Sequence, residues 1–125
     1  MNKICTSTGQ SDVLIKSGID VSTADMFYCN NGDIKLMWEH LPDIKVSSPA
    51  WSLSALLKLM PESLIPDNGA HQVYYMEVYN HDGLYCCDYV GEIERDSFVA
   101  FAEEDYIDAA VEMVKWLLEN KKISK

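Results

Sequence analysis

An Asp-Gly pair at positions 82 and 83 constrains the fold of this chain more than any other feature of the sequence. It separates two segments, 72–80 and 84–93, that are rich in β-branched and aromatic residues. Asp-Gly between two such segments is a strong signal for a tight β-hairpin turn, because glycine readily adopts the positive φ angle that this turn needs. The sequence therefore predicts a β-hairpin here.

The turn also predicts the register of the hairpin. With Asp82-Gly83 as a two-residue loop, His81 pairs with Leu84, and Glu77 lies opposite Asp88. Side chains alternate between the two faces of a strand. One face is an apolar core face made of Tyr74, Met76, Val78, Tyr85, Cys87, Tyr89 and Ile93. The other is a mixed aromatic and acidic surface made of Val73, Tyr75, Glu77, Tyr79, Cys86, Asp88 and Val90.

The candidate binding residues on that second face are Tyr75, Glu77, Tyr79 and Asp88. Like charges directly opposed on a sheet are destabilising, and the Glu77–Asp88 pair leaves three interpretations open. In the first interpretation the two carboxylates do not interact, because the loop is one residue longer or because both side chains point apart into solvent. Alternatively the two tyrosines anchor a protein partner, or the carboxylates form a metal-binding or catalytic pair. We favour the first interpretation and expect neither a cofactor nor a metal.

The remaining segments complete an α+β pattern. Helices are expected over 8–16, with Gly18 as the stop, over 50–60 between Pro49 and Pro61, and over 105–120. Another hairpin is expected from 25–29 and 34–39 around Gly32, and the strand set extends to 97–102. We expect a single domain, 1–125, with an antiparallel sheet built from two β-hairpins and covered by about three helices.

The last helix has a wider apolar arc than one sheet face needs. It is therefore either wedged between two elements or part of a homodimer interface. We favour the wedged arrangement.

Acidic residues outnumber basic ones by 20 to 10, which gives a formal net charge of −10. Ten carboxylates fall between Glu77 and Asp108, where Arg95 is the one arginine or lysine. Such a surface disfavours direct nucleic-acid binding. The acidic surface either keeps the protein soluble or binds a basic protein partner. The most specific form of the second hypothesis is that the surface imitates nucleic acid and so inhibits a nucleic-acid enzyme.

Other sequence features point to a cytoplasmic protein without recognisable catalytic machinery. The sequence contains no run of about 18 apolar residues that could cross a membrane, and the first residues lack the apolar core of a signal peptide.

The four cysteines show no metal-site spacing and are expected to be reduced, with one of Cys86 and Cys87 buried and the other more exposed. The three histidines, His40, His71 and His81, are expected at the surface. Nucleotide-binding, zinc-protease and hydrolase motifs are absent from the sequence, so a small carboxylate- or metal-using enzyme is only the alternative.

Three sequence blocks, at 18–26, 49–57 and 108–120, look familiar together. In these blocks the chain resembles a family of small uncharacterised proteins that phages, prophages and mobile elements of gut bacteria encode. The resemblance implies a genomic context, but it implies no activity and no site residue. We therefore expect a non-enzymatic accessory protein that acts through protein contacts, in which the acidic C-terminal half binds a basic host partner.

Overall fold

The computed structural model describes residues 3–29, 31–36, 46–66 and 72–123. The elements follow one another along the chain as α1 (Thr8–Lys16), the 3-10 helix η1 (Val21–Thr23), β1 (Met26–Cys29), β2 (Ile34–Leu36), β3 (Val46–Ala50), α2 (Leu53–Leu59), β4 (Ser63–Leu64), β5 (Tyr74–His81), β6 (Leu84–Gly91), β7 (Ser97–Glu103) and α3 (Tyr106–Glu119).

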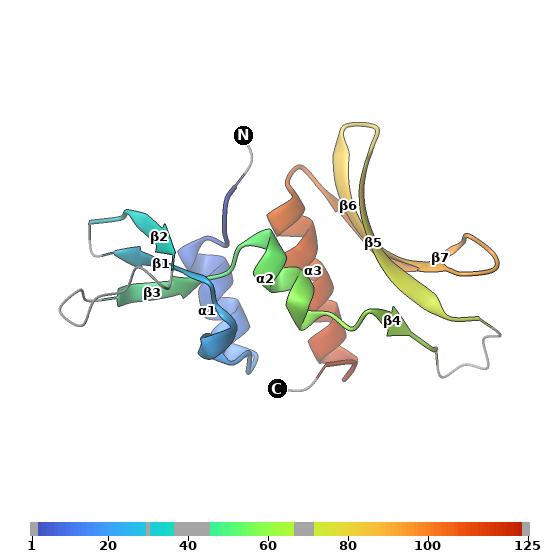
Figure 1. Cartoon of the computed structure of the whole chain (residues 1–125), viewed down its shortest axis with the longest axis horizontal. Coiled ribbons are helices and arrows are strands. Elements are labelled where there is room, and N and C mark those ends of the chain that lie inside the picture. Colours follow the sequence, from blue (N-terminus) through green and yellow to red (C-terminus); the bar gives the residue numbers. More distant parts are fainter. Residues whose placement is uncertain (1–2, 30, 37–45, 67–71, 124–125) are drawn as a thin grey trace.

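The three α-helices of the described chain lie in the middle of the molecule, with one antiparallel sheet at each end (Figure 1). The smaller sheet has the strand order β2-β1-β3, and the larger has the order β4-β5-β6-β7. The predicted α+β class and the helix number are therefore confirmed. The two hairpins, however, belong to two separate sheets rather than to one, because the helical layer separates them.

Helix α1 has the bounds that the sequence predicts. Ser7 and Gln10 form a capping box at its start, in which each side chain accepts a hydrogen bond from the other residue's backbone N–H. Gly18, just beyond the C-cap Ser17, has a φ angle of 103°. This left-handed conformation favours glycine and ends the helix.

Helix α2 starts later than predicted. Ser52 is its N-cap, and both its backbone N–H and its hydroxyl donate hydrogen bonds to Asp25. Pro49 is not in the first turn of the helix but in β3, where it pairs with Phe27. The prediction was wrong because β3 and the contacts of Asp25 hold the preceding residues extended, which the sequence of the helix itself does not reveal.

The first hairpin is confirmed as far as the structure describes it. Tyr28 pairs with Ile34, and Gly32 in the turn has a φ angle of 90°. The predicted end of its second strand, 37–39, lies outside the described residues.

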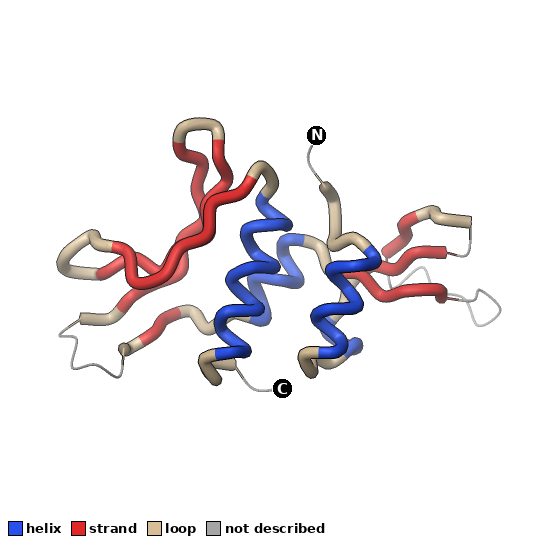
Figure 2. The backbone as a smooth tube through the Cα atoms, turned by 180° about the vertical axis from the view of Figure 1, so that it is seen from behind, coloured by secondary structure: helices blue, strands red, loops and turns tan. Residues whose placement is uncertain are grey.

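Helix α3 is wedged, as predicted, between α2 and the inner face of the four-stranded sheet (Figure 2). Asp105 caps it by accepting a hydrogen bond from the backbone N–H of Ile107 at 2.8 Å. Its buried residues are Ile107, Ala109, Ala110, Val111, Met113, Val114 and Leu117. These residues of the apolar arc are thus buried within a single chain, while a homodimer through this helix stays a prediction. Among the described helices, none is long and apolar enough to cross a membrane.

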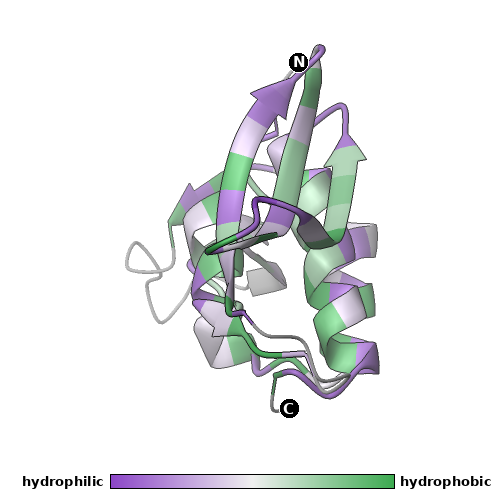
Figure 3. Cartoon of the chain, turned by 90° about the vertical axis from the view of Figure 1, so that its right-hand side faces the viewer, coloured by the Kyte–Doolittle hydropathy of each residue, from purple (hydrophilic) through white to green (hydrophobic). Residues whose placement is uncertain are grey.

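The second hairpin has the predicted two-residue loop and the predicted register, with His81 opposite Leu84 and Glu77 opposite Asp88. Its ribbon shows alternating hydrophobic and hydrophilic bands (Figure 3). The expected core face packs inward, except that Ile93 is 75% exposed. That residue was assigned wrongly because β6 ends at Gly91 and the chain turns away before Ile93.

Both adjacent cysteines are buried, although only one was expected to be. Cys87 points into the core, and burial raises the pKa of its thiol to about 12. Cys86 lies on the opposite face between Tyr79 and Ala102, its partners on the two neighbouring strands, which cover it. No disulfide links the four thiols.

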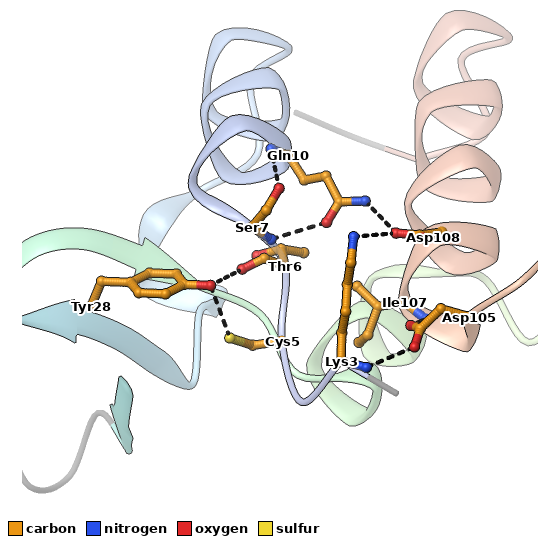
Figure 4. A network of polar contacts seen from close by, with 9 residues as sticks. All are labelled: Lys3, Cys5, Thr6, Ser7, Gln10, Tyr28, Asp105, Ile107 and Asp108. Atoms are coloured by element: carbon orange, nitrogen blue, oxygen red, sulfur yellow. Dashed lines mark hydrogen bonds and ion pairs between the residues drawn. The ribbon is translucent and has the colours of Figure 1, made fainter. Parts of the chain in front are cut away.

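A polar network ties the N-terminal segment to α3 and to the smaller sheet (Figure 4). The Nζ of Lys3 donates to Asp108 at 2.6 Å, and the amide of Gln10 donates to the same oxygen at 2.8 Å. Burial raises the pKa of the Asp108 carboxyl, but these two hydrogen bonds outweigh it and keep the pKa below its usual value. On the other side, the hydroxyl of Tyr28 donates to the carbonyl oxygen of Thr6 at 2.9 Å.

Candidate functional site on the outer face of the larger sheet

The outer face of the four-stranded sheet is the side turned away from α2 and α3 (Figure 1). Strand alternation and register place the following residues on it: Tyr75, Glu77, Tyr79, Cys86, Asp88, Val90, Ala100 and Ala102. Tyr75 and Tyr79 are 40% and 38% exposed. All four residues predicted for the binding site therefore lie on this one face.

A shallow pocket of about 440 Å³ opens on the outer face. It is lined by Glu77, Tyr79, Asp88, Val90, Arg95 and Ser97. Three of the four predicted residues line it, and Tyr75 lies beside it on β5, two residues from Glu77.

Asp88 forms the floor of this pocket and is only 4% exposed. Its two carboxylate oxygens accept hydrogen bonds from different hydroxyls: Tyr79 donates at 2.8 Å and Ser97 at 2.7 Å. These charge-assisted bonds compensate for the burial of the carboxylate. The burial of Asp88 was not predicted, since its cover comes from β7, whose register a bulge shifts between Val99 and Ser97.

Glu77 and Asp88 pair in register, but their carboxylates bind different partners. Glu77 forms an ion pair with Arg95, whose Nη2 lies 2.8 Å from Oε2 of Glu77. The prediction of a loop one residue longer was wrong. The opposed carboxylates are instead stabilised separately, Asp88 by two hydroxyl groups and Glu77 by Arg95. Arg95 and Ser97 were missed as site residues, although Arg95 stands out in the sequence as the one arginine of the acidic stretch.

The hydrogen bond to Asp88, together with burial and the neighbouring acidic groups, raises the pKa of Tyr79 to about 12. Its folded-state pKa lies above the ordinary value, so this tyrosine contributes stability that is present below pH 10 and is lost as the pH rises through about 12.

The substitution Asp88→Asn is expected to lower the pKa of Tyr79 toward its usual value, because it removes the charge that opposes ionisation of the phenol. Tyrosinate absorbance is titrated in each protein and in the same protein carrying Tyr79→Phe, and the difference reports Tyr79 alone. Wild-type protein should show little ionisation of Tyr79 below about pH 11, whereas the Asn variant should show most of it. Identical titrations would contradict the hydrogen bond.

The charged side chains that line the pocket have partners within the chain. Both oxygens of Asp88 and the carboxylate of Glu77 already have partners, and Cys86 is buried. Within the described ranges, His, Cys, Asp and Glu residues form no group of three that could hold a metal ion. His81 is exposed at the hairpin tip beside Asp82, as predicted, while His40 and His71 lie outside the described residues.

A second, smaller hollow of about 190 Å³ lies between the N-terminal segment and the smaller sheet. It is lined by Lys3, Ile4, Cys5, Ser7, Tyr28 and Ile34. The thiol of Cys5 is buried there, and burial raises its pKa, so it is a poor nucleophile.

Comparisons with known proteins give no information about the outer face, so it is interpreted from its own geometry. The resemblance to phage and mobile-element proteins stays a prediction, because none of these comparisons tests it. No protein-family model matches the chain, no curated protein is significantly similar to it, and no solved structure matches its fold significantly.

Proposed function

We propose that this protein is a non-enzymatic interaction module that binds a basic protein partner through the outer face of its four-stranded sheet. The observation that carries the proposal is an acidic pocket on a sheet face that no described helix covers, with the exposed Tyr79 in its lining and the exposed Tyr75 beside it. This combination gives the partner an apolar contact and a charged contact within a few residues of each other.

The two tyrosines supply the contact area. Their backbone is held in β5, which pairs with β4 and β6, so little backbone freedom is lost on binding. Tyr79 is further fixed by its bond to Asp88. Tyrosine has few rotatable bonds for its size, and rigid, half-exposed tyrosines are therefore efficient anchors of protein interfaces.

The charge of this region selects the partner. Three further carboxylates, Glu92, Glu94 and Asp96, are exposed in the loop that follows β6. Such a concentration of negative charge speeds association with a basic surface and repels nucleic-acid phosphates.

Arg95 illustrates what the pocket can accept. Its side chain is 64% exposed, and its guanidinium already forms an ion pair with Glu77 at the rim. An arginine or lysine of a partner would meet the same carboxylate, or would lie next to it over Tyr79, where a cation also gains from the aromatic ring. A phage or mobile-element origin would make host proteins the natural source of that partner.

The proposal is tested by capturing proteins from a bacterial lysate at low salt on immobilised wild-type protein and on single variants. Tyr75→Ala and Glu77→Gln should each weaken retention of the same basic protein about tenfold, and rising salt should release it from wild-type protein. Asp12→Asn is the matched control, because it removes one exposed negative charge from α1, away from the outer face. Equal retention by Glu77→Gln and Asp12→Asn, or retention that salt does not affect, would contradict the proposal.

A further inference from the structure

We infer that the free edge of β7 binds an extended segment of the partner as an added antiparallel or parallel strand, with basic residues at both ends of that segment. The inference rests on the proposed function and specifies how the partner binds. Addition of a strand to an exposed edge is a common mode of peptide recognition, in which backbone hydrogen bonds supply the affinity.

The edge of β7 is long and unprotected. Strand β7 is the last in the order β4-β5-β6-β7, and within the described residues no segment pairs with its other side. Its seven residues include neither proline nor lysine, which are the residues that usually block strand addition. By contrast, the opposite edge strand β4 has two residues, and the edge strand β3 of the smaller sheet contains Pro49.

The hydrogen bonds around Gly91 indicate which backbone groups of β7 point outward. The N–H of Gly91 donates toward β7, to the carbonyl of Asp96 at 2.9 Å, whereas the next N–H, of Glu92, donates toward β5, to Val73 at 2.9 Å. Backbone groups alternate in this way along an antiparallel strand, so the residues of β6 that bond to β7 are Tyr85, Cys87, Tyr89 and Gly91.

The register of β7 then separates its bonded residues from its free ones. Tyr85, Cys87 and Tyr89 pair with Glu103, Phe101 and Val99. The N–H and C=O groups of Ala100 and Ala102 therefore point toward the open edge. Both residues are exposed, and their small side chains leave room for a neighbouring strand. The bulge lies before Val99, so this part of the edge keeps a regular geometry.

The charges around the edge define the occupant. Exposed Asp96 precedes the strand, exposed Glu103 ends it and exposed Glu104 follows it, while residues 98–102 are uncharged. The complementary ligand is an extended peptide with about five uncharged residues between lysines or arginines. A second copy of this chain fits poorly, because antiparallel pairing of two β7 strands would bring Asp96 of one copy near Glu103 and Glu104 of the other.

The test uses amide hydrogen exchange by NMR on the full chain, with a synthetic probe peptide that has two lysines at each end of a Thr-Val-Thr-Val-Thr centre. Binding should slow exchange of the Ala100 and Ala102 amides at least about tenfold, and should leave the already bonded Phe101 amide nearly unchanged. A peptide with glutamates in place of the lysines, and a peptide with N-methylated central residues, are both expected to bind at least tenfold more weakly.

Ala100→Pro removes one outward N–H without removing a bond to β6, and it should abolish the protection, whereas Ala100→Ser should keep it. Two results would overturn the inference. One is an absence of peptide binding at low salt. The other is peptide binding that perturbs Tyr75 and Tyr79 but leaves the Ala100 and Ala102 amides unprotected. In the second case the proposed function would stand and only strand addition would fall, since capture from lysate tests the function separately.

Discussion

Replacing Trp51 with alanine is expected to lower the free energy of unfolding by about 3–5 kcal/mol, because the indole is completely buried and its removal leaves a large cavity. Trp51 lies between the end of β3 and the start of α2, and it belongs to the core that also includes Leu14 and Leu56. The loss is measured by urea denaturation followed by far-ultraviolet circular dichroism.

Thr23→Val is the matched control for Trp51. The Nε1 of Trp51 donates to the hydroxyl of Thr23 at 2.9 Å, and this hydroxyl donates to the carbonyl oxygen of Asp20 at 2.6 Å. The variant therefore removes these two hydrogen bonds and leaves the indole packing in place. It should cost about 1 kcal/mol. A Trp51→Ala variant no less stable than Thr23→Val would mean that the indole is not buried in the core.

Gly91→Ala is expected to cost about 2–3 kcal/mol of stability, near the upper end for overpacking. A methyl group at this position would lie 2.1 Å from the carbonyl oxygen of Glu94 and 2.4 Å from Nε2 of Gln72. The backbone cannot yield easily, because the side chain of Gln72 also accepts hydrogen bonds from the N–H groups of Ile93 and Glu94. Any shift of this loop would also move Arg95 away from Glu77, so binding at the outer face should weaken together with stability.

The matched control is Gly9→Ala in α1, where the nearest atom to the new methyl group is 3.9 Å away. Alanine is a better helix former than glycine, so this variant should gain about 0.5–1 kcal/mol. Thermal unfolding of both variants measures the contrast. If Gly91→Ala were as stable as Gly9→Ala, the close packing of the 92–96 loop on the strand end would be disproved.

The sequence predicted correctly those features that depend on neighbouring residues alone, such as tight turns and helix ends. The Asp82-Gly83 turn fixed the register of β5 and β6, and Gly18 marked the end of α1. The start of α2 was predicted too early, since Pro49 suits the first turn of a helix as well as an edge strand. The choice depended on pairing with Phe27, far away in the sequence. For the same reason, the division of the two hairpins between two sheets could not be predicted from either hairpin alone.

The candidate site was predictable in part. Alternation on β5 and β6 was enough to bring Tyr75, Glu77, Tyr79 and Asp88 onto one face. The burial of Asp88 was not predictable, because it depends on β7 and on the hydroxyl of Ser97.

The central claim is that the partner binds the outer face and the adjoining edge of the four-stranded sheet. It is tested most directly by hydrogen–deuterium exchange mass spectrometry of the full chain, alone and bound to the protein captured from lysate. We predict slower exchange in peptides that cover 75–79 and 97–103, with no change in α1 or in the smaller sheet. Protection confined to α1 and the smaller sheet, with the larger sheet unchanged, would contradict the account.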